Sequence, residues 1–116
     1  MKYNNDFSHD LEVGQIGEHA LGQILEGTDI EVKTDLRAHR TGNVFVEYQS
    51  RGKPSGIAKT NAQWWAFIIS DTQIILIETE KLKEVCRELY NLSSVVGGDN
   101  DTSSGVLVPI SRLVLT

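Results

Sequence analysis

Cysteine is almost absent from this sequence, and its absence limits both the chemistry and the compartment of the protein. Cys86 is the single cysteine among 116 residues, so no disulfide can form within the chain. Disulfide-stapled secreted domains are therefore excluded, and a reducing location such as the cytoplasm is expected. Cys86 itself is expected to be a small, buried core residue.

Long apolar runs and net positive charge are also missing. The longest apolar run, WWAFII, is too short to span a bilayer, and the opening MKYNNDFSHD lacks the apolar stretch of a signal peptide. No membrane partner is therefore expected. The formal net charge of −5 argues against a protein that attracts nucleic acid by its overall field. It does not exclude a metal-dependent enzyme, whose cations would offset clustered carboxylates.

Three common kinds of site lack their residues. The histidines have no metal-ligand spacing with one another or with Cys86, so a zinc site is not expected. No serine is marked as activated by a histidine and an acid. The phosphate-binding pattern G-x-x-x-x-G-K-[ST] does not occur.

The apolar residues that are present follow the patterns of one domain over residues 1–116. The length lies near the commonest domain size, and 40% hydrophobic residues suffice for a modest core. Apolar spacing predicts helices over 8–25 and 80–91, and strands over 29–35, 43–49, 64–70 and 72–79. The segment VLVPISRLVL, residues 106–115, predicts a last strand followed by a turn or short helix. This order indicates an α+β domain with a mixed β-sheet flanked by helices.

The connecting segments carry their own signals. The polar segment LRAHRTG, residues 36–42, is short enough for the strands on either side of it to pair antiparallel. A short helix is expected to start near residues 59–61, and GGDNDTSSG at residues 97–105 reads as a flexible connector. Pro109 predicts an edge position or a bulge for the last strand. Of Trp64 and Trp65, one should face the core and the other outward.

The stretch DIEVKTD, residues 29–35, alternates charged with uncharged residues. Side chains alternate across a strand, so Glu31, Lys33 and Asp35 should share one face, with Asp29 at its beginning. An antiparallel hairpin would bring Glu47 of the next strand opposite Glu31, with Lys33 and Gln49 beside them. Like charges across a strand pair are destabilising, so a lysine or a divalent cation must compensate.

Two interpretations of this acidic face remain open. Strands with one wet face routinely carry mixed charges, so the face is explained equally well as plain solvent-exposed surface. The combination of two such strands with a basic loop and a Gly-Ser loop favours a functional site. Glu18 lies in the predicted first helix beside its apolar face, and would reach the same cluster if that helix packs on the sheet.

A longer string carries a family resemblance. The residues GEHALGQIL…IEVKTDLRAHRTGNVFVEYQSRGKPSGIAKTNAQWWAF, from Gly17 to Phe67, resemble small phage and bacterial nucleases of the PD-(D/E)xK superfamily. The resemblance covers a little under half of the chain. It implies a restriction-endonuclease-like core, a metal-dependent DNA endonuclease activity and one or two Mg²⁺ (or Mn²⁺) ions.

The resemblance also implies roles for individual residues. Glu18 matches a helix acid, Glu31-Val-Lys33 has the E-x-K form, and Glu47-Tyr-Gln49 is a second candidate with glutamine in place of lysine. Asp29 or Asp35 would be the lone aspartate. The implied metal ligands are Glu18, Glu31, Asp35 and Glu47, and the implied catalytic residues are these four with Lys33 and Gln49.

The superfamily pattern leaves two assignments open. A strand bearing the aspartate normally precedes the E-x-K strand, but here residues 8–25 lead almost directly into DIEVKTD. In one assignment Glu31 and Lys33 form the motif, and Asp35 and Glu47 are additional ligands. In the other, Asp29 or Asp35 is the aspartate and Glu47 with Gln49 forms the motif. Gln49 cannot act as a base, so in that case it would only orient water or a ligand.

Cations and hydroxyls around the acidic face are the expected contacts to DNA phosphates. They are Arg37, His39, Arg40, Arg51, Lys53, Ser55, Lys59 and Thr60. Taken alone, each basic residue among them is more simply explained as part of a solvated loop. The small size of the domain favours a homodimer on DNA, and a dimer would suit branched DNA such as a junction.

The sequence therefore predicts an Mg²⁺-dependent endodeoxyribonuclease, which for a phage-encoded protein would act in the host cytoplasm. Gln49 and the short strand region leave room for a second function. This is a nuclease-like module that binds nucleic acid or protein without cutting. The third possibility is a non-catalytic interaction protein with an acidic face, consistent with the net charge of −5.

Overall fold

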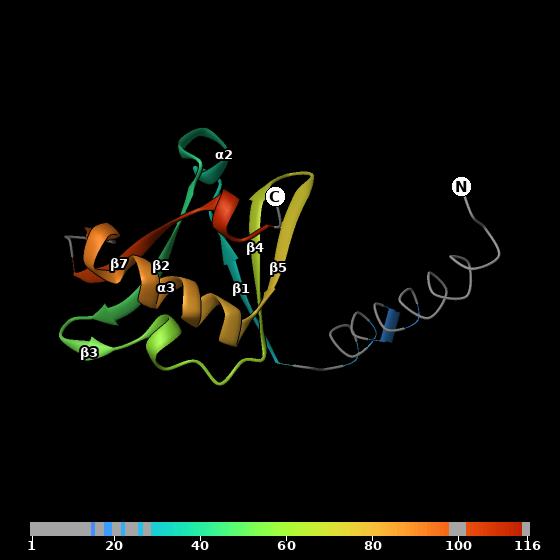
Figure 1. Ribbon diagram of the computed structural model, residues 1–116, viewed down its shortest axis with the longest axis horizontal. Coiled ribbons are helices and arrows are strands. Elements are labelled where there is room, and N and C mark those ends of the chain that lie inside the picture. The colour runs from blue at the N-terminus through green and yellow to red at the C-terminus, as the bar shows by residue number, and fades with distance from the viewer. Residues whose placement is uncertain are drawn as a thin grey trace.

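The computed structural model describes residues 15, 18, 19, 22, 26, 29–97 and 102–114. Over these residues the chain has an α+β fold built on two small sheets (Figure 1). In chain order the elements are β1 (Ile30–Thr34), α2 (Ala38–Thr41), β2 (Asn43–Ser50), β3 (Lys53–Pro54), η1 (Gly56–Ala58), β4 (Trp64–Ser70), β5 (Gln73–Glu78), α3 (Thr79–Ser93), β6 (Ser94–Gly97), β7 (Ser103–Pro109) and η3 (Ile110–Arg112).

The two sheets differ in the number of their strands and in the relative direction of those strands. The first is mixed, with strand order β1-β4-β5, where β1 runs parallel to β4 and β5 runs antiparallel to it. The second is antiparallel, with strand order β3-β2-β7-β6. Figure 1 shows β1 and β2 close together near α2 and separating toward their other ends. The mixed and antiparallel pairing confirms the α+β class.

The predicted hairpin between residues 29–35 and 43–49 is wrong. Both strands form, but the segment between them contains α2, whose Ala38 is fully buried, and this turn of helix directs the chain into the second sheet. β1 instead pairs with the apolar strand β4. In β2, Val44 and Val46 lie opposite Val108 and Val106 of β7. All four of these valines are at most 1% exposed, so pairing with β7 buries more apolar surface than a charged strand offers.

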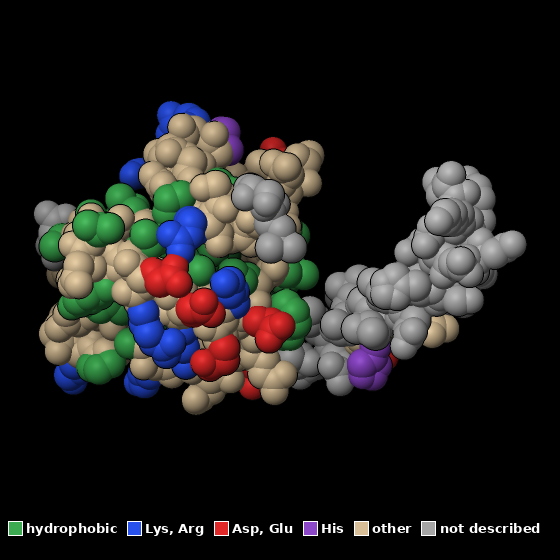
Figure 2. All heavy atoms as spheres, viewed as in Figure 1, with side chains coloured by type: hydrophobic (Ala, Val, Ile, Leu, Met, Phe, Trp, Pro, Cys, Tyr) green, Lys and Arg blue, Asp and Glu red, His purple; other side chains and the backbone are tan. Residues whose placement is uncertain are grey.

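Helix α3 covers the core formed by the two sheets. Its buried residues Leu82, Val85 and Cys86 recur at helical spacing, as expected for residues 80–91. They pack in one cluster with Trp65 and Phe67 of β4 and with the valines of the second sheet. Figure 2 shows acidic and basic side chains interspersed over the α3 side of the molecule, which is its solvated face.

Most other sequence-based boundaries agree with the structure. Strands β4 and β5 are joined by a turn at residues 71 and 72, and β7 is followed by a short 3-10 helix. Trp65 is buried at 1% exposure while Trp64 remains partly exposed, as the alternation predicts. The short helix expected near residues 59–61 lies earlier, as η1 at Gly56–Ala58.

Pairing refines one strand prediction and corrects one loop prediction. β7 lies between β2 and β6, but Pro109, its last residue, pairs with Asn43 and lies beyond the residues of β7 that pair with β6, so it has an edge position as predicted. Residues 103–105 belong to β7, so the connector predicted over 97–105 is shorter.

The first predicted helix, over residues 8–25, lies mostly outside the described residues. Those of its residues that are described, at positions 15, 18, 19 and 22, are helical. No helix in the described part of the chain is long and apolar enough to cross a membrane.

Burial of Cys86 generates a test of the core. Burial raises the pKa of this thiol from its usual 9.0 to about 11. The folded state therefore favours the neutral thiol, and this contribution is complete below pH 9 and is lost as the pH rises toward 11. We expect the free energy of unfolding of the native chain to fall over this window more steeply than that of Cys86→Ala, measured by chemical denaturation. Parallel curves for the two proteins would contradict the assigned burial.

Candidate functional site

Charged residues from two strands meet in a hollow between the sheets. This inter-sheet hollow has a volume of about 240 Å³. It is lined by Lys33, Thr34 and Asp35 of the β1 end, Phe45 and Glu47 of β2, and Trp65 and Phe67 of β4. It thus combines two carboxylates and one ammonium group over an aromatic floor.

The alternation of β1 turns its charged side chains toward this hollow. Glu31 and Lys33 lie opposite Trp65 and Phe67 of β4, so they share the face of the sheet that is directed at the core. Glu31 and Lys33 are half-buried, whereas Val32 on the other face is 55% exposed. The predicted common face of Glu31, Lys33 and Asp35 is therefore confirmed, and it is the inner face.

Asp35 connects the two sheets. Its backbone N–H donates to the Ile68 carbonyl at 2.9 Å, which fixes it to the first sheet. One oxygen of its carboxylate, Oδ2, accepts the backbone N–H of Phe45 in β2 at 3.3 Å. Phe45 pairs with β7 on one side only, because β3 reaches no further along β2 than Gln49. The Asp35 carboxylate therefore satisfies a backbone donor at an unpaired edge and holds β2 beside β1.

The backbone of Glu47 packs closely against a glycine, Gly56. Gly56 has a φ of +51°, and a Cβ at this position would lie 2.2 Å from the Glu47 carbonyl oxygen. The chain after β3 can therefore pack against β2 only if residue 56 is glycine. A register shift between Glu47 and Gln49 also bends β2 at this point. Together they fix the backbone that carries the Glu47 side chain into the hollow.

Lys33 has two neighbours in the site. Its Nζ lies 3.8 Å from Oε2 of Glu31 and 5.6 Å from the centroid of the Trp65 ring. The two side chains of the ion pair are 43% and 37% exposed, so solvent screens their attraction and the pair stabilises the fold little. The indole Nε1 of Trp65 is buried and has no hydrogen-bond partner among the described residues.

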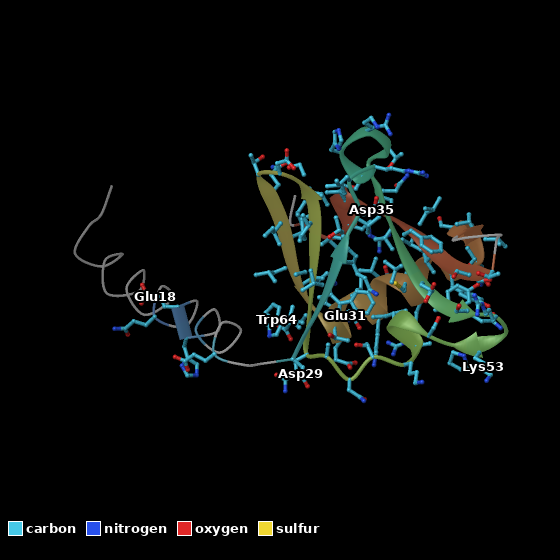
Figure 3. All side chains as sticks on the ribbon, turned by 180° about the vertical axis from the view of Figure 1, so that it is seen from behind. Glu18, Asp29, Glu31, Asp35, Lys53 and Trp64 are labelled. Atoms are coloured by element: carbon cyan, nitrogen blue, oxygen red, sulfur yellow. The ribbon has the colours of Figure 1, made fainter. Side chains whose placement is uncertain are left out.

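The structure separates some residues that the sequence had grouped. Glu31 and Glu47 do not face each other across a strand pair, because β1 and β2 belong to different sheets. Gln49 pairs with Ser104 and Pro54 at the far end of β2 and does not line the hollow. Figure 3 shows Glu18 well apart from Glu31 and Asp35, so the structure does not bring the predicted helix acid to this site.

The candidate DNA contacts fall into separate groups. Arg37, His39 and Arg40 are exposed on or beside α2, close to the Asp35 end of the hollow. Arg51 and Lys53 lie at the turn between β2 and β3, and Figure 3 shows Lys53 far from Asp35. Ser55, Lys59 and Thr60 flank η1. The α2 group is therefore the basic cluster that follows Asp35 directly in the chain.

The described residues contain no cluster of three or more histidine, cysteine or acidic side chains that could hold a metal ion together. The hollow supplies the pair Asp35 and Glu47. Mg²⁺ keeps several waters and is usually bound through one or two carboxylates plus substrate phosphates. The pair therefore fits Mg²⁺ or Mn²⁺ shared with a substrate, and does not fit an all-protein calcium cage.

Two contributors to the site escaped the sequence analysis. One of Trp64 and Trp65 was expected to face the core; Trp65 does so, and it also forms the floor of the hollow beside Lys33. The WW pair at the start of an apolar strand signalled one inward ring, but its contact with Lys33 depends on the parallel pairing of β1 with β4. No short pattern marked Gly56, because its contact with Glu47 follows only from the folded path.

Comparisons with known proteins identify no relative: no family model, no curated protein and no solved structure matches this chain.

The support of Glu47 by Gly56 generates a second test. We expect Gly56→Ala to lower the free energy of unfolding by about 2 kcal/mol more than Gly52→Ala, because forced overpacking costs roughly 1–3 kcal/mol. Gly52 is the matched control: its φ is +78°, and a Cβ there meets nothing within 4 Å. Backbone strain is thus common to both variants, and only the contact with Glu47 differs. Equal losses in urea denaturation would contradict the close packing of residue 56 on β2.

Proposed function

We propose that this protein is a metal-dependent DNA endonuclease that hydrolyses phosphodiester bonds at the inter-sheet hollow. The observation that carries the proposal is the convergence of Asp35, Glu47 and Lys33 on one hollow from two different sheets. Its second support is the resemblance of residues 17–67 to nucleases of the PD-(D/E)xK superfamily, in which the same residue types serve.

The hollow favours one of the two motif assignments. Asp35 as the lone aspartate and Glu47 as the motif acid both line it, whereas Glu31 contacts Lys33 and is not among the lining residues. Lys33 of β1 would then supply the positive charge that the motif Glu47-Tyr-Gln49 lacks, because glutamine stands there in place of lysine. The proposed ligands are therefore Asp35 and Glu47, with Lys33 as the accompanying cation.

Bound Mg²⁺ would supply Lewis-acid chemistry here, by lowering the pKa of an attacking water and stabilising charge on the phosphate. The residues of this chain would do the rest. Lys33 would hold a non-bridging phosphate oxygen or orient the water, since its ammonium already lies beside Glu31 and over Trp65. The contact of Lys33 strengthens as charge accumulates on the phosphate.

The position of α2 suggests how a DNA backbone would approach. Arg37, His39 and Arg40 are exposed around this short helix, and Asp35 lies immediately before it. Cations at the mouth of an acidic hollow would hold flanking phosphates and offset the net charge of −5. A homodimer would present two such mouths to branched DNA, and the cytoplasm is the proposed location.

Charge-removing substitutions test the proposed ligands. We expect Asp35→Asn and Glu47→Gln each to lower the rate of supercoiled plasmid cleavage in Mg²⁺ or Mn²⁺ by about 100-fold or more, because each removes an anionic metal ligand. EDTA should abolish cleavage by the native protein. The asparagine oxygen can still accept the Phe45 N–H, so Asp35→Asn should keep the fold.

The control for these variants is Glu84→Gln, an exposed acid of α3 that pairs with Lys81 and lies outside the hollow. It should cleave at the native rate. Cleavage by Asp35→Asn and Glu47→Gln at the native rate would rule out the proposed site, as would cleavage that persists in EDTA.

One observation favours a second candidate, a nuclease-like module that binds nucleic acid without cutting. Only two acids line the hollow, and the described residues contain no cluster of three metal-binding side chains. The affinity of such a module for DNA would fall when Arg37 and Arg40 are replaced. The DNA would stay uncut in both Mg²⁺ and Mn²⁺. DNA binding with no cleavage in Mg²⁺ or Mn²⁺ would establish this alternative, and the absence of binding would exclude both.

A further inference from the structure

A second hollow lies between α3, η1 and the second sheet. It has a volume of about 480 Å³, within the range of small-ligand sites. Its base is apolar and is formed by Ile57, Cys86 and Val106, each at most 7% exposed. Its lining shares no residue with that of the inter-sheet hollow. This pocket is therefore separate from the inter-sheet hollow.

Two tyrosines form one wall of this α3 pocket. The rings of Tyr48 and Tyr90 lie 5.3 Å apart between centroids, tilted by 58°. Tyr90 remains 50% exposed, although it is a large aromatic residue on the helix face that packs toward the sheet. A hydrogen bond with Tyr48 raises the pKa of the Tyr90 hydroxyl above its ordinary value. The wall thus offers aromatic surface and hydroxyl groups together.

Two cations stand at the mouth of the pocket, and no acid lines it. Lys83 and Arg87 are four residues apart on α3, so they lie on the same face of the helix one turn apart. Arg87 makes no ion pair with any described residue, and Lys83 pairs only with Glu80, a highly exposed residue, at 3.5 Å. In a chain with a net charge of −5, the unpaired Arg87 gives the mouth a positive group that an anion can contact, and the partly exposed Lys83 lies beside it. Charge complementarity selects an anionic occupant.

We propose that the α3 pocket binds a nucleotide. The base would lie over the apolar floor against the exposed Tyr90 ring, and the phosphate would contact Arg87 and Lys83 at the mouth. This site is independent of the proposed nuclease activity, because it shares no residue with the inter-sheet hollow.

The lining of the pocket distinguishes a nucleotide from other small anions. Aromatic side chains stack with any nucleobase, and such stacking is worth about 1–3 kcal/mol per base. The planar guanidinium of an arginine matches phosphate oxygens two at a time, and a lysine one turn away adds a point charge. An aliphatic carboxylate would fill the apolar floor but would gain nothing from the tyrosine wall. An inorganic phosphate would leave the floor empty.

NMR titration of the ¹⁵N-labelled full chain, without divalent metal, tests the proposal. The probes are dAMP, deoxyadenosine, deoxyribose 5-phosphate and octanoate. We expect dAMP to shift the amide signals of Ile57, Ala58 and Val106, and to bind about tenfold more tightly than each of the other three, since each of them lacks one contact. Shifts at the inter-sheet hollow instead of these residues would overturn the assignment of the site.

Three variants separate the two halves of the ligand. Arg87→Gln should weaken dAMP about tenfold, as expected for one charge-assisted contact, and leave deoxyadenosine unchanged. Tyr90→Leu should weaken both. The matched control is Lys81→Gln, which removes an exposed lysine of the same helix that does not line the pocket and should change neither.

The proposal fails if octanoate binds as tightly as dAMP, because the pocket would then recognise apolar anions in general. It also fails if Lys81→Gln weakens dAMP as much as Arg87→Gln does, because the attraction would then be diffuse. Failure of either kind would leave the plasmid-cleavage experiments unaffected. Loss of plasmid cleavage would in turn leave the nucleotide titration unaffected.

Discussion

The hydrogen bond from the Phe45 amide to the Asp35 carboxylate is the contact on which the arrangement of the site depends. It joins two sheets whose strands otherwise hydrogen-bond only within their own sheet at this point. A backbone donor at a buried or half-buried strand edge must find an acceptor, and a carboxylate is a strong one. By serving as this acceptor, Asp35 holds β2 beside β1. Glu47 is thereby brought to the same hollow as Lys33.

This constraint explains why the acidic face can be half-buried. A charged strand placed at the edge of a sheet normally turns its charges to water. Here Val32 faces out and Glu31 and Lys33 face in, against Trp65 and Phe67. The ion pair of Glu31 with Lys33, the ring of Trp65 under the ammonium and the Phe45 donor on Asp35 each satisfy part of that charge. Among the described residues Glu47 has no such partner, which leaves its carboxylate available to a ligand.

Local patterns predicted the elements well and their pairing poorly. The strands over 29–35 and 43–49, the tryptophan strand and the helix over 80–91 all follow from periodicity within short windows. The hairpin was wrong because the choice of strand partner depends on how much apolar surface each pairing buries over the whole chain. Val44 and Val46 gain more from β7 than from β1, and β7 is some sixty residues away in the sequence. The alternation of side chains within β1 does not depend on which strand β1 pairs with. The prediction that Glu31, Lys33 and Asp35 share one face was therefore correct.

The residues of the candidate site also divide into those that a local pattern predicts and those that only the folded structure reveals. Residue type and spacing singled out Lys33, Asp35 and Glu47 before their contacts were visible. Trp65 and Gly56 owe their roles to contacts made only in the folded chain, so no short pattern marks them. The α3 pocket belongs to this second class as well. Tyr48, Tyr90 and Arg87 come from distant segments, and only the packing of α3 on the second sheet brings them together.

The central claim is that Asp35 and Glu47 form one cation site, and anomalous diffraction from crystals of the full chain soaked in Mn²⁺ tests it most directly. Our account predicts a peak in the inter-sheet hollow within about 2.0–2.4 Å of an oxygen of each carboxylate, as divalent cations bind acidic ligands. Density that places the two carboxylates on opposite sides of β2, or a Mn²⁺ ion bound elsewhere with this hollow empty, would contradict the claim.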